Sequence, residues 1–239
     1  MLRLSIVVPA YNEEETIEET LISLKEQDYS NIELIVVDNN SSDRTNELAK
    51  KQCNSVYLET EQGYIAAVNR GAKEATGDLI TFCDADSFYP KNWASQIVTE
   101  FEKSREIVAV YGSADTHDSN AIQNHINGFF YTLFLRISRL LGLDNTSGFN
   151  FVMRRASFIK VGGYDPKFKK MSPDIELGKR LKKEGLISFN PSIKVRSSFR
   201  RYQESGVLST QWMFFKAWWA MLRNVEPSVS YDEYNQIKK

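Results

Sequence analysis

At residues 79–86 the chain reads Leu79-Ile80-Thr81-Phe82-Cys83-Asp84-Ala85-Asp86. The first five residues predict a buried β-strand, and two aspartates follow at its carboxyl end. Because side chains alternate along extended backbone, Asp84 and Asp86 are expected to face one ligand together. Two carboxylates at this spacing repel each other unless a cation lies between them, and hard oxygen ligands favour Mg²⁺ or Mn²⁺. A polar turn after a buried strand is the alternative interpretation.

Two further apolar strands precede this one, at residues 4–8 and 32–37. Apolar residues at helical spacing predict helices between the strands, at residues 13–27, 43–52 and 64–75. This alternation predicts an α/β fold with a mostly parallel sheet flanked by helices. Such sheets bind ligands at the carboxyl ends of their strands, where this chain has the polar loops 9–13 and 38–42.

Length and composition limit the class of protein. The chain has 239 residues, 42% of them hydrophobic, which suits one globular domain or a domain with a modest appendage. Its 30 basic and 31 acidic residues nearly cancel, which argues against nucleic acid as a partner. Cys53 and Cys83 lie in no metal-ligand spacing and are expected to be reduced. We see neither a secretory leader nor a membrane-spanning run and expect a cytoplasmic protein.

The pattern is less regular beyond residue 90. We expect a helix at 93–101, a strand at 107–111, a polar loop at 116–124 and a strand-and-helix unit that begins at 149–155. A further helix is expected to start at Pro173-Asp174 and to continue to about Lys183. The last helix, at 207–223, is rich in tryptophan and phenylalanine and includes Lys216 and Arg223.

Four segments share an order and spacing that identify a family. They are Ser5-Ile6-Val7-Val8-Pro9-Ala10-Tyr11-Asn12-Glu13-Glu14, then Val36-Val37-Asp38-Asn39-Asn40-Ser41-Ser42-Asp43, then Asn69-Arg70-Gly71 through Asp84-Ala85-Asp86, and finally Gly162-Gly163-Tyr164-Asp165 leading to Asp174-Ile175-Glu176-Leu177. Over about residues 3–200 the chain resembles the inverting glycosyltransferases of family 2, which have the GT-A fold. The resemblance implies a GT-A domain at 1–202, with a nucleotide-sugar-binding half at 1–115 and an acceptor-binding half at 116–202. An amphipathic helical extension then occupies 203–239.

The resemblance also implies roles for single residues in binding the donor, a UDP- or GDP-sugar. Asp84 would lie near the ribose and the metal, and Asp86 would bind the cation, Mg²⁺ or Mn²⁺. Arginine forks suit phosphate oxygens, so two arginines after the last core strand are expected to close over the diphosphate. The residues expected to bind the nucleotide-sugar are Pro9, Ala10, Tyr11, Glu13, Asp38, Asp84, Arg200 and Arg201.

The reaction needs a base that takes a proton from the acceptor hydroxyl, and Asp174 is the candidate. The family usually has a Glu-Asp pair at this helix start, whereas this chain has Pro173-Asp174, so one carboxylate carries the assignment. Helix capping is the alternative role, because a helix N-terminus favours negative charge. Glu176 is a second possible base, although residues two apart in a helix do not share a face.

Two aromatic segments depart from a plain enzyme domain, at 129–143 and 207–223. They indicate peripheral contact with the inner face of a plasma membrane and an acceptor that is a glycan or is lipid-linked. Burial against the catalytic domain or a second subunit is the alternative. A catalytically inactive nucleotide-sugar-binding or scaffold protein is the alternative function. A dehydrogenase is excluded because Pro9-Ala10-Tyr11-Asn12 stands where a glycine-rich loop would follow the first strand.

Overall fold

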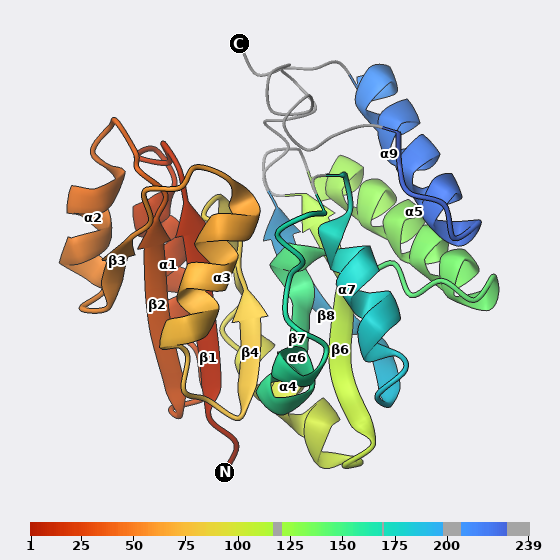
Figure 1. Ribbon diagram of the computed structural model, residues 1–239, viewed down its shortest axis with the longest axis horizontal. Coiled ribbons are helices and arrows are strands. Elements are labelled where there is room, and N and C mark those ends of the chain that lie inside the picture. Colours follow the sequence, from red (N-terminus) through yellow and green to blue (C-terminus); the bar gives the residue numbers. More distant parts are fainter. Residues whose placement is uncertain (117–120, 169, 198–206, 229–239) are drawn as a thin grey trace.

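The computed structural model describes residues 1–116, 121–168, 170–197 and 207–228. Here the chain forms an eight-stranded mixed sheet with helices on both faces (Figure 1). The strand order is β3-β2-β1-β4-β7-β6-β8-β5. The strands are β1 (Leu4–Ala10), β2 (Ile32–Asp38), β3 (Val56–Leu58), β4 (Leu79–Phe82), β5 (Ser87–Phe88), β6 (Ile107–Thr116), β7 (Phe151–Arg154) and β8 (Leu186–Ser197).

The first half of the sheet confirms the predicted α/β alternation. Strand β1 pairs in parallel with β2 and β4, and β2 pairs in parallel with β3. Helix α1 (Ile17–Lys25), helix α2 (Thr45–Gln52) and helix α3 (Tyr64–Glu74) connect these strands. Because each crossover returns the chain to the same end of the sheet, the carboxyl ends of β1, β2 and β4 share one edge.

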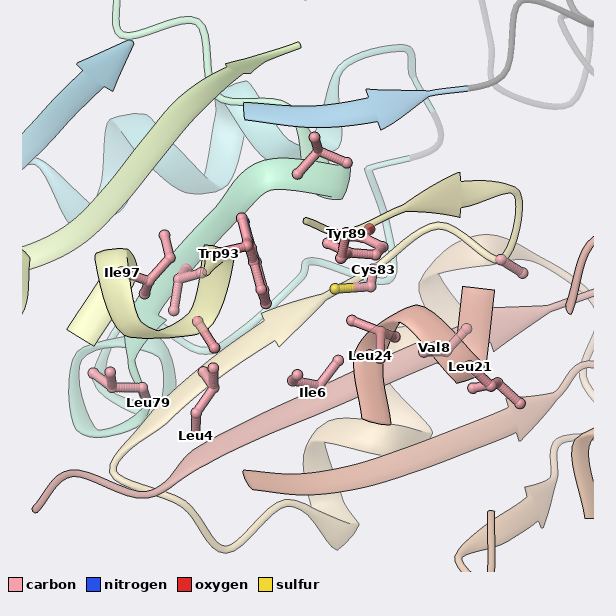
Figure 2. Packing of buried hydrophobic residues seen from close by; sticks show 14 of the residues in the cluster. Leu4, Ile6, Val8, Leu21, Leu24, Leu79, Cys83, Tyr89, Trp93 and Ile97 are labelled. Atoms are coloured by element: carbon pink, nitrogen blue, oxygen red, sulfur yellow. The ribbon is translucent and has the colours of Figure 1, made fainter. Parts of the chain in front are cut away.

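Side-chain alternation divides the core into two layers. Figure 2 shows the first layer, in which the even-numbered apolar residues of β1 pack with α1 and with helix α4 (Trp93–Glu102). The labelled members are Leu4, Ile6, Val8, Leu21, Leu24, Leu79, Cys83, Tyr89, Trp93 and Ile97. On the opposite face Val7 packs against Ala67 and Val68 of α3. Burial on both faces explains why these strands read as continuous apolar runs.

The second half of the sheet adds antiparallel pairings. Strand β7 pairs antiparallel with both β4 and β6, β8 pairs in parallel with β6, and β5 pairs antiparallel with β8. Four of the seven pairings are therefore parallel, in keeping with a mostly parallel sheet. The short helix η1 (Gly148–Asn150) precedes β7, and because β7 runs opposite to β4, it lies near the carboxyl end of β4. This topology brings Gly148 to the edge where the polar loops gather.

Several boundaries differ from the predictions. Strands β3 and β5 have two or three residues and were too short to predict from periodicity. The predicted loop at 116–124 is partly regular structure, because β6 extends to Thr116 and helix α5 (Ala121–Leu140) begins five residues later. Helix α6 (Arg155–Lys160) and helix α7 (Pro173–Leu181) occur where expected.

Helix α9 (Val207–Leu222) packs on α5 and α7 rather than standing apart from them (Figure 1). Trp218 is buried with Met221 against Ile175 of α7, and its indole N–H donates to Ser138 Oγ at 2.9 Å. The ring of Phe134 on α5 lies 5.4 Å from that of Trp218. Within the described residues, no helix combines the length and the apolar character needed to cross a membrane.

Candidate active site

Hydrogen bonds join the loops that follow β1 and β2. Ala10 lies opposite Asp38 in the parallel register, and the Asn39 N–H donates to the Ala10 carbonyl at 2.8 Å. Asn12 has a φ of 53°, a left-handed conformation that asparagine tolerates, and its side-chain oxygen accepts from the Ser42 N–H at 2.8 Å. The two loops therefore form one connected surface at the carboxyl edge of the sheet.

Asp38 and Asn39 are buried at this edge, with 3% and 5% of their surface exposed. The Asp38 carboxylate accepts hydrogen bonds from the Ser41 N–H at 3.2 Å and from Asn46 Nδ2 at 3.0 Å. Asn39 Oδ1 accepts from the Gly63 N–H at 2.8 Å, so Asn39 positions the loop that leads into α3. Each side chain thus orders the backbone around a surface to which a ligand could bind.

The two aspartates after β4 leave the sheet from a turn. Strand β4 ends at Phe82, Ala85 and Asp86 lie in the turn, and Asp86 is 7% exposed while Asp84 is half-buried. The assumption of extended backbone through Asp86 was therefore wrong. Burial raises the pKa of Tyr89 well above its usual value, and the charges of Asp84 and Asp86 add to this shift. Both carboxylates thus lie within electrostatic reach of one tyrosine.

The donor set at this turn suits one kind of metal binding. Among the described residues, no group of three or more histidine, cysteine, aspartate or glutamate side chains could hold a metal ion. Asp84 and Asp86 offer two carboxylates only. Mg²⁺ is commonly bound by one or two carboxylates and completes its coordination with water and substrate phosphates, so two carboxylates fit a cation that arrives with a nucleotide.

Asp174 lies in the first turn of α7, where Pro173 precedes it and Ser172 has a left-handed φ of 65°. The Tyr164 hydroxyl donates to Asp174 Oδ1, and the Gly148 N–H also donates to this carboxylate. Burial raises the pKa of Asp174 to about 6, although both hydrogen bonds oppose the shift by favouring the charged form. A carboxylate with this pKa is largely ionised at neutral pH and still able to accept a proton.

Two tyrosines connect Asp174 with the end of β4. The Tyr164 ring lies 5.3 Å from that of Phe82, the last residue of β4, and 6.1 Å from that of Tyr64 on α3. Burial raises the pKa of Tyr164 well above its usual value, and the charges of Asp174 and Asp84 act in the same direction. Tyr164 therefore contacts both Asp174, to which its hydroxyl donates, and the end of the strand that leads to Asp84, 90 positions earlier in the sequence.

Gly148 leaves room for this group of side chains. A Cβ atom at this position would lie 2.9 Å from the Tyr64 hydroxyl and 3.1 Å from Asp174 Oδ1. The sequence pattern assigned no role to Tyr64, Tyr164 or Gly148, although Tyr64 begins a predicted helix and Tyr164 lies in one of the four family segments. Nothing local in the chain shows that these residues meet.

Glu176 lies in a different environment from Asp174. Its carboxylate receives two hydrogen bonds from Arg180, at 2.7 Å from Nε and 2.6 Å from Nη2. Arg180 Nη1 also donates to the carbonyls of Val161 and Gly163 at 2.6 and 2.7 Å. Glu176 therefore holds the arginine that supports the turn before Tyr164, and this ion pair disfavours Glu176 as the base.

A hollow of about 290 Å³ lies beside α3 and reaches Pro173, the neighbour of Asp174, but its lining includes none of Asp38, Asp84, Asp86 and Asp174. Tyr64 and Pro173 line it, together with Glu61, Arg70 and Lys170. Of the predicted nucleotide residues, Ala10 is buried, Pro9 and Glu13 are half-buried, and Tyr11 is 49% exposed. Arg200 and Arg201 lie outside the described residues.

Solved structures of several sugar-transferring enzymes share this fold. One is the mannosyltransferase PcManGT from Pyrobaculum calidifontis in complex with GDP-Man and Mn²⁺, with a TM-score of 0.74 and 20% identity over 99% of this chain and 68% of that one. Another is S. aureus TarS 1-349 in complex with UDP-GlcNAc, with a TM-score of 0.67 and 18% identity over 99% of this chain and 70% of that one. The protein therefore has the GT-A architecture of glycosyltransferases.

The sequence comparison specifies the family. Residues 5–162 match the model of glycosyl transferase family 2, and the chain belongs to this family. Poly-beta-1,6-N-acetyl-D-glucosamine synthase from Staphylococcus epidermidis is 28% identical over 170 residues, which cover 67% of this chain and 41% of the relative. The same-named protein of Staphylococcus aureus strain COL is 28% identical over 172 residues, 68% of this chain and 42% of the relative. The matched region thus spans about two fifths of these relatives.

Proposed function

We propose that this chain transfers a sugar from a nucleoside-diphosphate sugar to an acceptor hydroxyl, with inversion at the anomeric carbon and with help from Mg²⁺ or Mn²⁺. One observation carries the proposal. Asp174, whose pKa is raised to about 6, accepts a hydrogen bond from the Tyr164 hydroxyl, and the Tyr164 ring packs against Phe82, two residues before Asp84. A base and a cation-binding turn close to one another are what a single displacement requires.

Asp174 would act as the general base. It would accept the proton of the acceptor hydroxyl as the oxygen attacks the anomeric carbon, on the side opposite the departing diphosphate. Tyr164 and the Gly148 N–H hold the carboxylate in one orientation, and position contributes much of the effect of such a base. Because the displacement is direct, no covalent enzyme intermediate is required.

Asp84 and Asp86 would hold the cation. When bound, it would act as a Lewis acid that stabilises negative charge on the diphosphate leaving group. Asp38 and the Pro9-Ala10-Tyr11 backbone would hold the nucleotide, with Glu13 in the same connected loop. The half-exposed Tyr11 ring is available to contact the base of the nucleotide. Arg200 and Arg201 remain predicted ligands of the diphosphate.

The names of the relatives support the choice of donor and acceptor. PcManGT was solved with GDP-Man and TarS with UDP-GlcNAc, which supports a GDP- or UDP-sugar as the donor. The relatives called poly-beta-1,6-N-acetyl-D-glucosamine synthase support a glycan acceptor, free or lipid-linked. We place the reaction in the cytoplasm, at the inner face of the plasma membrane.

Purified protein offers a direct test. A thermal-shift screen of UDP- and GDP-sugars with and without Mn²⁺ should find a donor that raises the melting temperature, because ligand binding stabilises the folded state. That donor should then be transferred to an acceptor or slowly hydrolysed. Asp174→Asn should abolish turnover and keep the thermal shift. Donor binding without any metal-dependent turnover by the unchanged protein would favour the scaffold alternative and refute the proposed reaction.

A further inference from the structure

Helix α5 has an apolar surface on the side that faces away from the sheet. Its inward side is buried, with Leu135 and Ser138 fully covered. Large apolar side chains with exposed fractions between 40% and 87% recur at helical spacing along the outward side and just beyond the helix. They are Ile126, Phe129, Phe130, Leu133, Ile137, Leu140 and Leu141. A surface helix ordinarily has polar residues on this side, so the stripe is unusual.

Helix α9, which lies beside α5, carries further exposed aromatic side chains. While Ala217, Trp218 and Met221 are buried, Trp212, Phe214, Phe215 and Trp219 are between 38% and 57% exposed. Rings of Trp212 and Phe215 stack at 5.6 Å, and the Lys216 ammonium lies 5.5 Å from the centre of the Trp212 ring. We call these four residues, the six on α5 and Leu141 just beyond it the α5–α9 face. The two helices lie side by side (Figure 1), in contact through Phe134 and Trp218.

The extent of this surface is unusual for a protein that meets only water. Taking about 150–250 Å² for each large side chain, the exposed fractions of these eleven residues amount to on the order of 1000 Å². The largest apolar patch on a typical monomer covers roughly 300–600 Å². The α5–α9 face therefore calls for a partner.

The charges on the two helices identify the partner's chemistry. Neither the sequence of α5 nor that of α9 contains an aspartate or a glutamate, although about one residue in eight of the whole chain is acidic. Arg136, Arg139 and Lys216 are their charged residues, and Arg223 follows α9. Arg139 pairs with Asp144 at 3.2 Å, so Arg136, Lys216 and Arg223 are the positive charges that bear on a partner. A second copy of this chain is disfavoured, since a two-fold interface would place these positive charges against each other. A partner with an apolar interior and an anionic surface complements the face.

We propose that the α5–α9 face docks the protein on a membrane surface that contains anionic lipid. Tryptophan and phenylalanine would enter the interfacial region, as tryptophan favours the boundary between hydrocarbon and water. The long stems of Lys216 and Arg136 let their charges reach lipid headgroups while the aromatic rings insert. The proposal concerns attachment, so it holds or fails independently of sugar transfer.

The attachment would lie close to the candidate active site. Ile175, the neighbour of Asp174, packs in one cluster with Trp218 and Met221 of α9. Lys179 on α7 donates hydrogen bonds to the Met221 carbonyl and to Asn224 Oδ1. Helix α9 therefore packs directly against α7, the helix that carries Asp174. This arrangement would bring the proposed base close to a membrane bound by α9, as an acceptor in the lipid requires.

Vesicle co-sedimentation of the full chain tests the proposal. We expect binding to vesicles of phosphatidylcholine with phosphatidylglycerol, weaker binding to phosphatidylcholine alone, and loss of binding in a Trp212→Ser/Trp219→Ser variant. Lys216→Glu should weaken binding by well over fivefold, since each basic residue near an anionic surface contributes about a fivefold effect and the change also adds a negative charge. Ile159→Ser and Lys50→Glu are matched controls on other surfaces, because Ile159 is 56% exposed and Lys50 is exposed on α2. Both should bind as the unchanged protein does.

Three results would overturn the proposal. The first is unchanged protein that stays in the supernatant with phosphatidylglycerol vesicles. The second is tight binding by a folded Trp212→Ser/Trp219→Ser variant, with folding verified by an unchanged melting temperature. The third is an unchanged protein that is a dimer in light scattering and does not bind vesicles, together with a Trp212→Ser/Trp219→Ser variant that is a monomer. This result would show that the face joins two copies.

Discussion

The hydrogen bond from Tyr164 to Asp174 makes a quantitative prediction about the pH dependence of activity. Tyr164→Phe removes the hydroxyl and keeps the buried ring, which packs against Phe82 and Tyr64. The lost bond favoured the charged form of Asp174, so the pKa of Asp174 should rise above its present value of about 6. The acidic limb of the pH–rate profile should therefore move to higher pH.

The size of this shift follows from the strength of the bond. A hydrogen bond to a charged group contributes about 1.5–3 kcal/mol, and about 1.4 kcal/mol corresponds to one pKa unit, so the pKa should rise by roughly 1–2 units. With a pKa of about 7.5, the ionised fraction at about pH 6.5 falls from roughly three quarters to roughly one tenth. We expect the rate at that pH to fall about eightfold, with a much smaller change near pH 9.

The assay is kcat/KM for sugar transfer or donor hydrolysis across this pH range. Tyr111→Phe is the matched control, because Tyr111 is also buried and its hydroxyl donates to a carboxylate, that of Asp144, at 3.3 Å. It should leave the acidic limb in place. An active Tyr164→Phe variant with the same acidic limb as the unchanged protein would refute the assignment of Asp174 as the titrating base.

Three further predictions concern neighbouring positions. Because the folded pKa of Asp174 is about 6, above the roughly 3.9 of an unfolded aspartate, the folded state keeps this proton longer and loses stability as pH rises between these values. Asp174→Asn should therefore raise the free energy of unfolding at pH 7.5 by up to about 3 kcal/mol, less where water reaches the carboxylate, and should change it little near pH 3. If the variant and the unchanged protein are equally stable at both pH values in urea titrations, this prediction is wrong. Glu176→Gln should lower the free energy of unfolding by about 0.5–1 kcal/mol, because its contacts with Arg180 lose their opposite charges, and should reduce kcat far less than Asp174→Asn. Abolished turnover in a folded Glu176→Gln variant would instead make Glu176 the base. Gly148→Ala should lower kcat at least tenfold and leave donor affinity unchanged, because the new methyl group would displace the Asp174 carboxylate. An unchanged kcat would show that the carboxylate tolerates this displacement.

Local patterns were sufficient to predict the first half of the fold. The strands at Leu4–Ala10, Ile32–Asp38 and Leu79–Phe82 are buried on both faces, so each is a continuous apolar run that periodicity detects. Parallel strands need crossovers, and the helices between them show a 3.6-residue period. The positions of Asp38, Asp84 and Asp86 at one edge followed from this topology alone. The turn at Asp86 did not follow, because a two-residue strand beyond it has no detectable period.

The role of α9 depended on tertiary contacts. The sequence shows aromatic residues at five of the eight positions of 212–219 and does not distinguish a buried side from an exposed one. Packing against α5 and α7 separates Trp218, which is 8% exposed, from Trp219, which is 48% exposed. Neighbouring tryptophans of identical chemistry thus acquire different roles, one in the core and one on the α5–α9 face.

By itself, the sequence determined the family, the order of strands and helices in the first half, and the acids that stand at strand and helix ends. Each of these depends on residues close together in the chain, where periodicity and motif spacing carry the information. Only the tertiary structure decided which groups meet around Asp174. The antiparallel strand β7 brings Gly148 beside the end of β4, and the turn held by Arg180 brings Tyr164 to the same place. Burial and hydrogen bonding by these distant residues set the pKa of Asp174, and neither has a signature in local sequence.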